Sequence, residues 1–213
     1  MSNNAFVEQI ETLIRLGYPA MLAMPEPAFI DSLAVLESRP PTAQEAAVGQ
    51  VPFVIVINSH HAPVEAMLPL ARRQGKVPVE RLFPRKPNDF VPQIELPGGE
   101  AYLLVDVDRG ADYRNITPDA AYLAITKGGR SPLTISEGIA VLTHAPDLLQ
   151  PNMCFSLLAS RCGDKRVPAL WLSEGRPKLG WCWAGNPHTW LGSASCAART
   201  GSVNFNPAEI NTP

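Results

Sequence analysis

The spacing of apolar residues predicts that the chain begins with two helices. Phe6, Ile10 and Leu13 recur at helical intervals, which predicts a helix over residues 5–16, and glutamates occupy its opposite side. A second apolar stripe predicts a helix over residues 27–38. Each helix is therefore expected to pack one face against a core.

Apolar runs without helical spacing predict four strands. Residues 51–57, VPFVIVI, are apolar on both faces and rich in β-branched side chains, so this strand is expected at the centre of a sheet. A second strand is expected over residues 101–108. Residues 154–160 and 167–172 are expected to form two more, joined by a charged turn.

Capping residues predict further helices between these strands. Thr117 occupies an N-cap position before a helical segment at residues 118–127. A threonine followed three residues later by glutamate forms a capping box, which satisfies free N–H groups of the first turn, and this spacing occurs at Thr42–Glu45 and Thr134–Glu137. Another helix is expected over residues 63–74.

Length and composition place these elements in one globular unit. The chain has 213 residues, of which 46% are hydrophobic and 18% charged, so it can bury a core without disulfides. Helices first, scattered strands and later helices predict an α+β fold, with a small mixed or antiparallel sheet and several helices in a single domain over residues 1–199. Residues 200–213 are expected to form a loosely ordered C-terminal tail.

Charge and hydropathy exclude several classes of partner. A formal net charge of −2 and a pI of about 6.1 provide no basic surface for nucleic acid or anionic membranes. No apolar run approaches the roughly 18 residues of a membrane span, and the N-terminus lacks the apolar region of a signal peptide. The four cysteines have no CxxC pairing. We therefore expect reduced thiols in a cytoplasmic protein, while the oligomeric state is not indicated.

The candidate functional segment is GWCWAGNPHTWLGSASC, residues 180–196. It contains three of the four tryptophans, two of the four cysteines and one of the four histidines, a mixture typical of neither an ordinary helix nor an ordinary strand. Aromatic walls around a polar or reactive group are typical of small-molecule pockets. We therefore predict a small-molecule pocket with these binding residues: Trp181, Trp183, Asn186, His188, Trp190 and Arg161.

The chemistry of this segment has several interpretations. Cys182 or Cys196, with His188 as its base, has the composition of a thiol enzyme. Cys182, His188 and Cys196 are also candidate metal ligands, with Cys154, Cys162 or water in the fourth position. The short paired spacings of zinc sites are missing, however, so we predict no metal and no cofactor. An inert buried thiol with a structural histidine, or a protein-interaction module without catalysis, explains the same residues.

Two other polar groups are weaker candidates. Asp106, Asp108 and Asp112 approach the spacing of a calcium loop, but the glycine and the glutamate that such a loop requires are missing, so a turn is expected. His60 and His61 follow a strand, where they can bind a metal or an anion but are expected to be solvated.

Several segments resemble one bacterial family. They are DFVPQIELPGGEAYLLVDVDRG, GRSPLTISEGIAVL, CFSLLASRCGDKRVPALWL and PKLGWCWAGNPHTWLGSASCAAR. They are similar to a family, found largely in actinobacteria, that is catalogued as a domain of unknown function, and the similarity extends from the first helix to about Arg199. The resemblance implies a single-domain soluble bacterial protein. It implies no catalytic residue, because no activity is assigned to the family.

Overall fold

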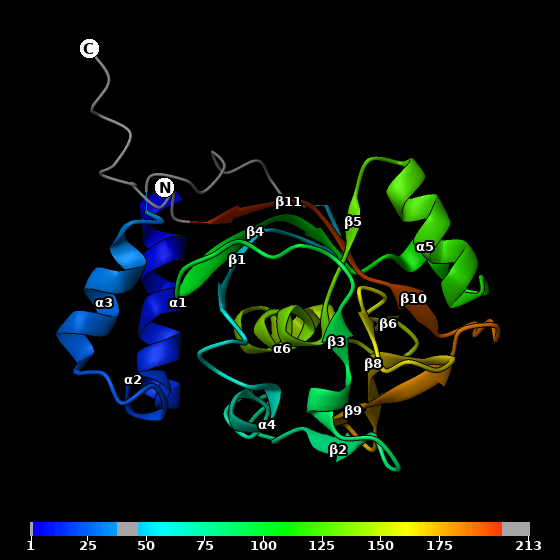
Figure 1. Ribbon diagram of the computed structural model, residues 1–213, viewed down its shortest axis with the longest axis horizontal. Helices are drawn as coiled ribbons and strands as arrows, with labels where there is room; N and C mark the ends of the chain where they lie inside the picture. The colour runs from blue at the N-terminus through cyan, green and yellow to red at the C-terminus, as the bar shows by residue number, and fades with distance from the viewer. Residues whose placement is uncertain (1, 38–46, 202–213) are drawn as a thin grey trace.

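Helix α6 (Ile135–His144) lies at the centre of the protein, with strands of two sheets packed against it (Figure 1). The computed structural model describes residues 2–37 and 47–201. Every residue of α6 from Ile135 to Thr143 is buried, which is typical of a helix surrounded by protein. The fold of the described residues is α+β, as the sequence predicted.

The other helices lie around these layers (Figure 1). Three helices sit together at one side of the four-stranded sheet: α1 (Ser2–Leu16), α2 (Tyr18–Met21) and α3 (Glu26–Ala34). Helices α4 (Val64–Met67) and α5 (Pro118–Lys127) lie apart from them. Single 3-10 turns are η1 (Pro87–Asp89), η2 (Ala111–Tyr113) and η3 (Pro146–Leu148). None of the helices in the described part of the chain is long and apolar enough to cross a membrane.

The strands form three sheets. The first is antiparallel, in the order β1 (Gln50–Ile57), β4 (Ala101–Asp108), β11 (Ser195–Gly201) and β5 (Ser131–Pro132). The second is mixed, in the order β10 (Leu191–Ser193), β6 (Cys154–Ser156), β8 (Arg166–Ser173), β9 (Arg176–Trp183) and β2 (Val79–Arg81). The third pairs β3 (Val91–Pro92) with β7 (Ser160–Arg161).

The predicted helices and strands occur largely where the apolar pattern placed them. Helices α1, α5 and α6 and strands β1, β4 and β8 overlap their predicted segments. Both hydrogen bonds of the predicted capping box are present, because the Thr134 hydroxyl accepts from the Glu137 N–H and the Glu137 carboxylate accepts from the Thr134 N–H. The other predicted box, Thr42–Glu45, lies outside the described residues.

Two predicted elements are wrong. The helix expected over residues 63–74 is the single turn α4, after which the chain turns and forms an isolated bridge between Arg73 and Lys76. The single strand expected over residues 154–160 is divided between β6 and β7, which belong to different sheets. The apolar run therefore includes the point at which the chain passes from one sheet to another, and hydropathy alone does not indicate that point.

The 180–196 segment is more regular than predicted. Strand β9 continues through Trp183, β10 begins at Leu191 and β11 begins at Ser195, so the irregular part is residues 184–190. Strand β11 extends to Gly201 and includes the first two residues of the expected tail.

Strand β1 is an edge strand, not the central strand that its sequence predicted. Its buried half owes its burial to α1 and α6, which pack against it. The side chain of Gln9 covers its free edge, because Gln9 Nε2 donates to the Phe53 carbonyl at 3.1 Å and Gln9 Oε1 accepts from the Ile55 N–H at 2.8 Å. One amide side chain thus takes the place of a neighbouring strand.

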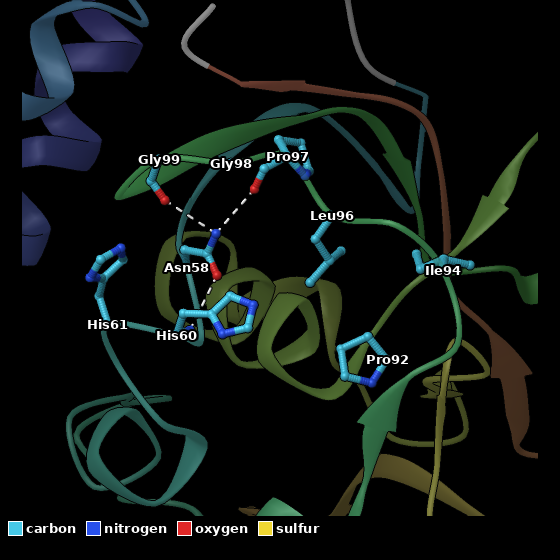
Figure 2. Close-up of a pocket in the computed structure, with 9 residues that line it drawn as sticks. All are labelled: Asn58, His60, His61, Pro92, Ile94, Leu96, Pro97, Gly98 and Gly99. Carbon is cyan, nitrogen blue, oxygen red and sulfur yellow. Dashed lines mark hydrogen bonds between the residues drawn. The ribbon is translucent and has the colours of Figure 1, made fainter. Parts of the chain in front are cut away.

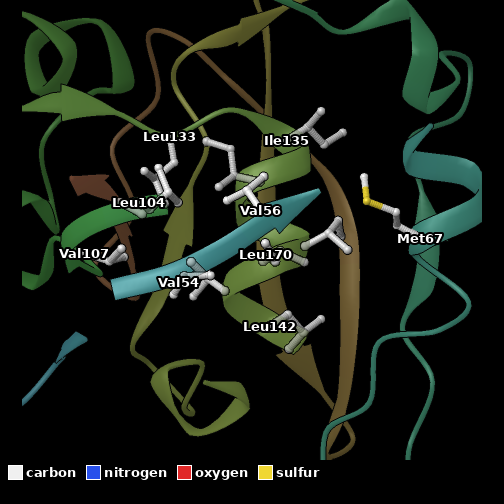
Figure 3. Packing of buried hydrophobic residues seen from close by; sticks show 14 of the residues in the cluster. Val54, Val56, Met67, Leu104, Val107, Leu133, Ile135, Leu142 and Leu170 are labelled. Carbon is white, nitrogen blue, oxygen red and sulfur yellow. The ribbon is translucent and has the colours of Figure 1, made fainter. Parts of the chain in front are cut away.

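The hydrophobic core lies where β1, α6 and β8 meet. Figure 3 shows Val54 and Val56 of β1, Ile135 and Leu142 of α6, and Leu170 of β8 directed into one cluster. All five side chains are buried. Because they come from β1, α6 and β8, their packing fixes the two larger sheets relative to α6.

A buried ion pair joins α6 to the four-stranded sheet. The fully buried Glu137 carboxylate accepts from Arg199 Nε at 2.6 Å, Arg199 Nη2 at 2.8 Å and the Tyr102 hydroxyl at 2.9 Å. Burial and the negative charge of Glu137 raise the pKa of Tyr102 well above its usual value, so its hydroxyl remains a donor. Arg199 is therefore engaged in the core.

Candidate functional site

The β8–β9 hairpin positions two of the predicted pocket residues, Trp181 and Trp183. Its turn is Glu174–Gly175, and both residues have positive φ values, as a two-residue hairpin turn requires. The register pairs Arg166 with Trp183 and Val167 with Cys182. Alternate residues of a strand face opposite sides of a sheet, so the Cys182 side chain lies on one face and the Trp183 side chain on the other.

The two faces of this hairpin have different surroundings. One face carries Leu170 and Leu179, which are fully buried toward the core. The other face, called here the outer face, carries Ala169, Trp171 and Cys182 in the same register. Trp181 and Trp183 alternate onto the same face as Leu179, toward the end of β9.

The connection between β9 and β10 covers the outer face. Strands β8 and β6 lie between β9 and β10 in the sheet, so residues 184–190 must cross a width of about 14 Å, three inter-strand spacings. Since the core fills the inner face, the crossing runs over the outer one, and it borders an open cavity of about 350 Å³. The residues that line this cavity are Ala169, Trp171, Trp181, Cys182, Trp183, Asn186, His188, Trp190 and Leu191.

Gly180 gives the Trp171 indole its position on the outer face. A Cβ atom at Gly180 would lie 2.2 Å from Cη2 of Trp171, so a larger residue would displace the indole. The ring therefore lies across the strand pair beside Cys182, as part of the cavity wall. The glycine within the unusual motif thus has a steric explanation.

Main-chain hydrogen bonds anchor the 184–190 connection. The His188 carbonyl accepts from the Asn115 N–H at 2.8 Å, and the Ala184 carbonyl accepts from the Asp119 N–H at 3.1 Å. The His188 ring lies 5.3 Å from the Trp190 ring, centroid to centroid, and makes no hydrogen bond within the described residues. The backbone is therefore fixed, while the half-buried imidazole keeps both nitrogens available.

Cys182 lacks the environment of an activated thiol. It is 8% exposed, its Sγ lies 3.7 Å from the Ser156 hydroxyl, and no hydrogen bond joins it to His188 in the part of the chain that the structure describes. Burial raises the pKa of the Cys182 thiol above its usual value. At neutral pH the sulfur is therefore protonated, whereas nucleophilic cysteines need a stabilised thiolate.

The three candidate metal ligands do not converge. Cys196 belongs to β11 in the four-stranded sheet, whereas Cys182 belongs to β9 in the five-stranded sheet. Residues 2–37 and 47–201 contain no group of three or more His, Cys, Asp or Glu side chains arranged to hold a metal ion. All four cysteines are free thiols.

A known protein family matches most of this chain. The model of the family of unknown function DUF5701 matches residues 12–202. The chain belongs to this family. The resemblance predicted from the sequence is thereby confirmed, and the matched region includes every residue of the cavity. No match is found among curated proteins or among solved structures.

The cation beside the tryptophans of this DUF5701 protein is Arg166, not the predicted Arg161. The guanidinium carbon of Arg166 lies 4.7 Å from the Trp181 ring centroid, and the Trp181 Nε1 donates to the Phe83 carbonyl at 3.1 Å. Arg161 instead pairs with the exposed Asp119 at 3.4 Å and does not line the cavity. The Glu174–Gly175 hairpin turn was the sequence signal for Arg166, since it sets the register that places this arginine opposite Trp183.

A second hollow in the DUF5701 fold contains the paired histidines. It has a volume of about 390 Å³ and lies between the end of β1 and residues 92–99 (Figure 2). The Asn58 amide shapes it by donating to the carbonyls of Pro97 at 3.0 Å and Gly99 at 3.2 Å. Figure 2 shows the imidazoles of His60 and His61 directed away from each other, and both residues are exposed. They do not form a common ligand pair.

Two of the three aspartates that approach calcium-loop spacing, Asp106 and Asp108, have structural partners. Asp106 pairs with Arg130 at 2.6 Å, and Asp108 accepts from the Gly110 N–H at 2.6 Å. These contacts belong to the end of β4 and the turn that follows it, as the sequence analysis expected.

Proposed function

We propose that the cavity beneath the 184–190 connection binds a small, planar and largely apolar molecule without covalent chemistry. The observation that carries this proposal is a cavity of about 350 Å³ with indole and aliphatic walls, including Trp171, Trp190 and Leu191. Ligand sites commonly combine such walls with few polar groups. Trp181 and Trp183 border the same cavity from β9, with their rings against Arg166.

Two polar side chains supply orientation in this proposal. Asn186 and His188 line the cavity from the crossing connection. An amide and an imidazole each offer a donor and an acceptor, so they suit a ring with a hydrogen-bonding edge. The apolar walls would hold the faces of that ring, because stacking on indoles favours flat ligands.

Binding is favoured over thiol chemistry by the state of Cys182. Its thiol is buried and protonated, and its recorded hydrogen-bond partner is Ser156. A thiol enzyme needs a base within hydrogen-bond reach of the sulfur, a role that the sequence analysis assigned to His188. We therefore assign His188 to ligand binding.

Titration with indole and quinoline, followed by ligand-observed NMR, tests the proposal. We expect saturable binding to the native protein and loss of about fivefold or more in affinity for Trp190→Ala, because stacking on one indole contributes about 1 kcal/mol or more. Phe83→Ala is the matched control, since Phe83 is an aromatic residue that is 86% exposed and outside the cavity. Absence of saturable binding to the native chain, or unchanged binding by Trp190→Ala, would contradict the proposal.

The polar part of the proposal has its own variant. His188→Gln keeps a donor and an acceptor without an aromatic ring. We expect a melting temperature close to that of the native protein, because the His188 ring has no hydrogen bond to lose among the described residues. Quinoline binding should weaken. A large loss of stability would instead make His188 a structural residue.

A cytoplasmic location in a bacterium completes the proposal. It is supported by four free thiols, which are typical of a reducing compartment. Fractionation of native cells with an antibody to the protein checks it, and recovery from an exported fraction would contradict it.

A further inference from the structure

A third cavity contains a buried arginine without a carboxylate partner. It has a volume of about 340 Å³ and lies where the end of β4 approaches the end of α6 and η3. The residues that line it are Gly49, Val51, Arg109, His144, Ala145, Pro146, Asp147, Leu148 and Gln150. Arg109 is only 6% exposed, so its charge is almost fully removed from water.

The hydrogen bonds of Arg109 do not compensate its burial. Its Nη1 donates to the Leu148 carbonyl at the long distance of 3.4 Å, and its Nε is buried with no partner in the described chain. No carboxylate among the described residues lies within 4 Å of its guanidinium nitrogens, and Asp147 pairs with Arg73 at 3.8 Å instead. A buried guanidinium without a counter-charge is costly, so such a group is expected to meet an anion in its working state.

The surrounding backbone is shaped to the guanidinium. Gly49 has a φ of +91°, and a Cβ atom there would lie 2.8 Å from Arg109 Nε. The main chains of the two residues are also joined, because the Arg109 N–H donates to the Gly49 carbonyl at 3.1 Å. Glycine at this position both permits the left-handed conformation and leaves room for the guanidinium.

We propose that this cavity binds a small monocarboxylate, with its carboxylate on the Arg109 guanidinium and its apolar portion against Val51, Ala145 and Pro146. The planar guanidinium matches a carboxylate, to which it can donate two parallel hydrogen bonds. The site contributes one buried positive charge, and one negative charge balances it.

The remaining polar groups favour a monoanion over phosphate. Burial, offset in part by the nearby Ile55 carbonyl, lowers the pKa of His144 to about 4, so His144 adds no second positive charge at neutral pH. The exposed carboxylate of Asp147 at the rim repels a dianion more strongly than a monoanion. This cavity lies beside β1 of the four-stranded sheet, whereas the aromatic cavity lies against the five-stranded sheet. The inference is therefore independent of the aromatic cavity.

Calorimetric and NMR titration of the full chain with benzoate and butyrate tests the inference. Benzamide and butyramide serve as uncharged probes of the same shape, and inorganic phosphate serves as the dianionic probe. We expect saturable binding of at least one carboxylate, no binding of its amide, and weaker binding of phosphate. Arg109→Met should weaken carboxylate binding by about tenfold or more, because it removes charge-assisted hydrogen bonds. Arg176→Met, at an exposed arginine that does not line the cavity, and Trp190→Ala should both bind as the native protein does.

Three titration results would overturn the inference. They are the absence of saturable carboxylate binding to the native chain, unchanged binding by Arg109→Met, and tighter binding of phosphate than of either carboxylate. If Arg109→Met does not fold, Arg109→Lys replaces it, since lysine keeps the charge but loses the planar fork and should also weaken binding. In the native protein, intermolecular NOEs must link the ligand to the methyl groups of Val51 or Ala145, and ligand NOEs confined to the indoles of the aromatic cavity would overturn the assignment.

Discussion

The guanidinium carbon of Arg166 lies 4.9 Å from the centroid of the Trp183 ring, directly across the β8–β9 hairpin. The same guanidinium is 4.7 Å from the Trp181 ring, and the two indoles meet edge to face at 4.8 Å. Asp164 accepts from Arg166 and from Arg85. One arginine therefore fixes both indoles on the side of the hairpin opposite Cys182.

Replacement of Arg166 by Gln should destabilise the protein moderately. The variant loses two contacts between a cation and an indole as well as the partly exposed ion pair with Asp164, so we expect a loss of about 1 kcal/mol in the free energy of unfolding. Urea denaturation measures it. Arg176→Gln, at the exposed start of β9, should change stability by less than about 0.5 kcal/mol. Equal effects of the two variants would show that the stacking contributes nothing.

Replacement of Glu137 by Gln should be far more damaging. The variant leaves the Arg199 guanidinium buried without its counter-charge, and breaking a buried pair in this way costs about 3–5 kcal/mol. Tyr102→Phe removes one donor to the same carboxylate and should cost about 1 kcal/mol. Chemical denaturation of both variants checks the order, and a Glu137→Gln variant as stable as Tyr102→Phe would contradict the proposed role of the ion pair.

The four thiols should differ in their reactivity in the native protein. Cys162 is half-buried, whereas Cys154, Cys182 and Cys196 are buried, and burial raises the pKa of Cys196 to about 11. We expect iodoacetamide at neutral pH to modify Cys162 first and the other three only after denaturation. Peptide mass analysis over a time course measures this order. Early modification of Cys182 would restore it as a candidate reactive thiol.

Stability should fall in acid through His144. Its ring nitrogens are shielded from solvent, and its folded-state pKa of about 4 lies below the ordinary value of 6.5. The unfolded chain therefore takes up a proton first, so this contribution is complete above pH 6.5 and is lost as the pH falls toward 4. The total loss is on the order of 3 kcal/mol.

The difference between native protein and His144→Gln isolates this effect. Other groups titrate in the same range, but they are common to both proteins and cancel when the unfolding free energies are subtracted at each pH. We expect the difference to change steadily between pH 7 and pH 4. Parallel stability curves for the two proteins would show that His144 is accessible to protons in the folded state.

The sequence predicted individual elements better than their arrangement. Capping chemistry is local, so Thr134 and Glu137 correctly marked the start of α6. The position of β1 depends on which strands pair beside it, and the covering of its edge by α1 makes an edge strand as apolar as a central one. Hydropathy indicates that a segment is buried, but it does not indicate which elements bury it.

The candidate cavity was predictable only in part. Trp190 and His188 line it, because aromatic and polar residues are concentrated in one short connection. Trp171 belongs to it through a strand register, and Arg109 meets its cavity through the packing of distant elements. These positions depend on which strands pair and which distant elements pack together. A single sequence indicates strand pairing only at turns such as Glu174–Gly175.

The amide of Gln9 has a consequence for the behaviour of this protein in concentrated solution. It occupies the free N–H of Ile55 and the carbonyl of Phe53, the groups through which an exposed strand recruits a strand from another molecule. If α1 detaches, a Val- and Ile-rich edge is released for intermolecular pairing. Docking of the first helix thus protects the protein against aggregation as well as covering its core.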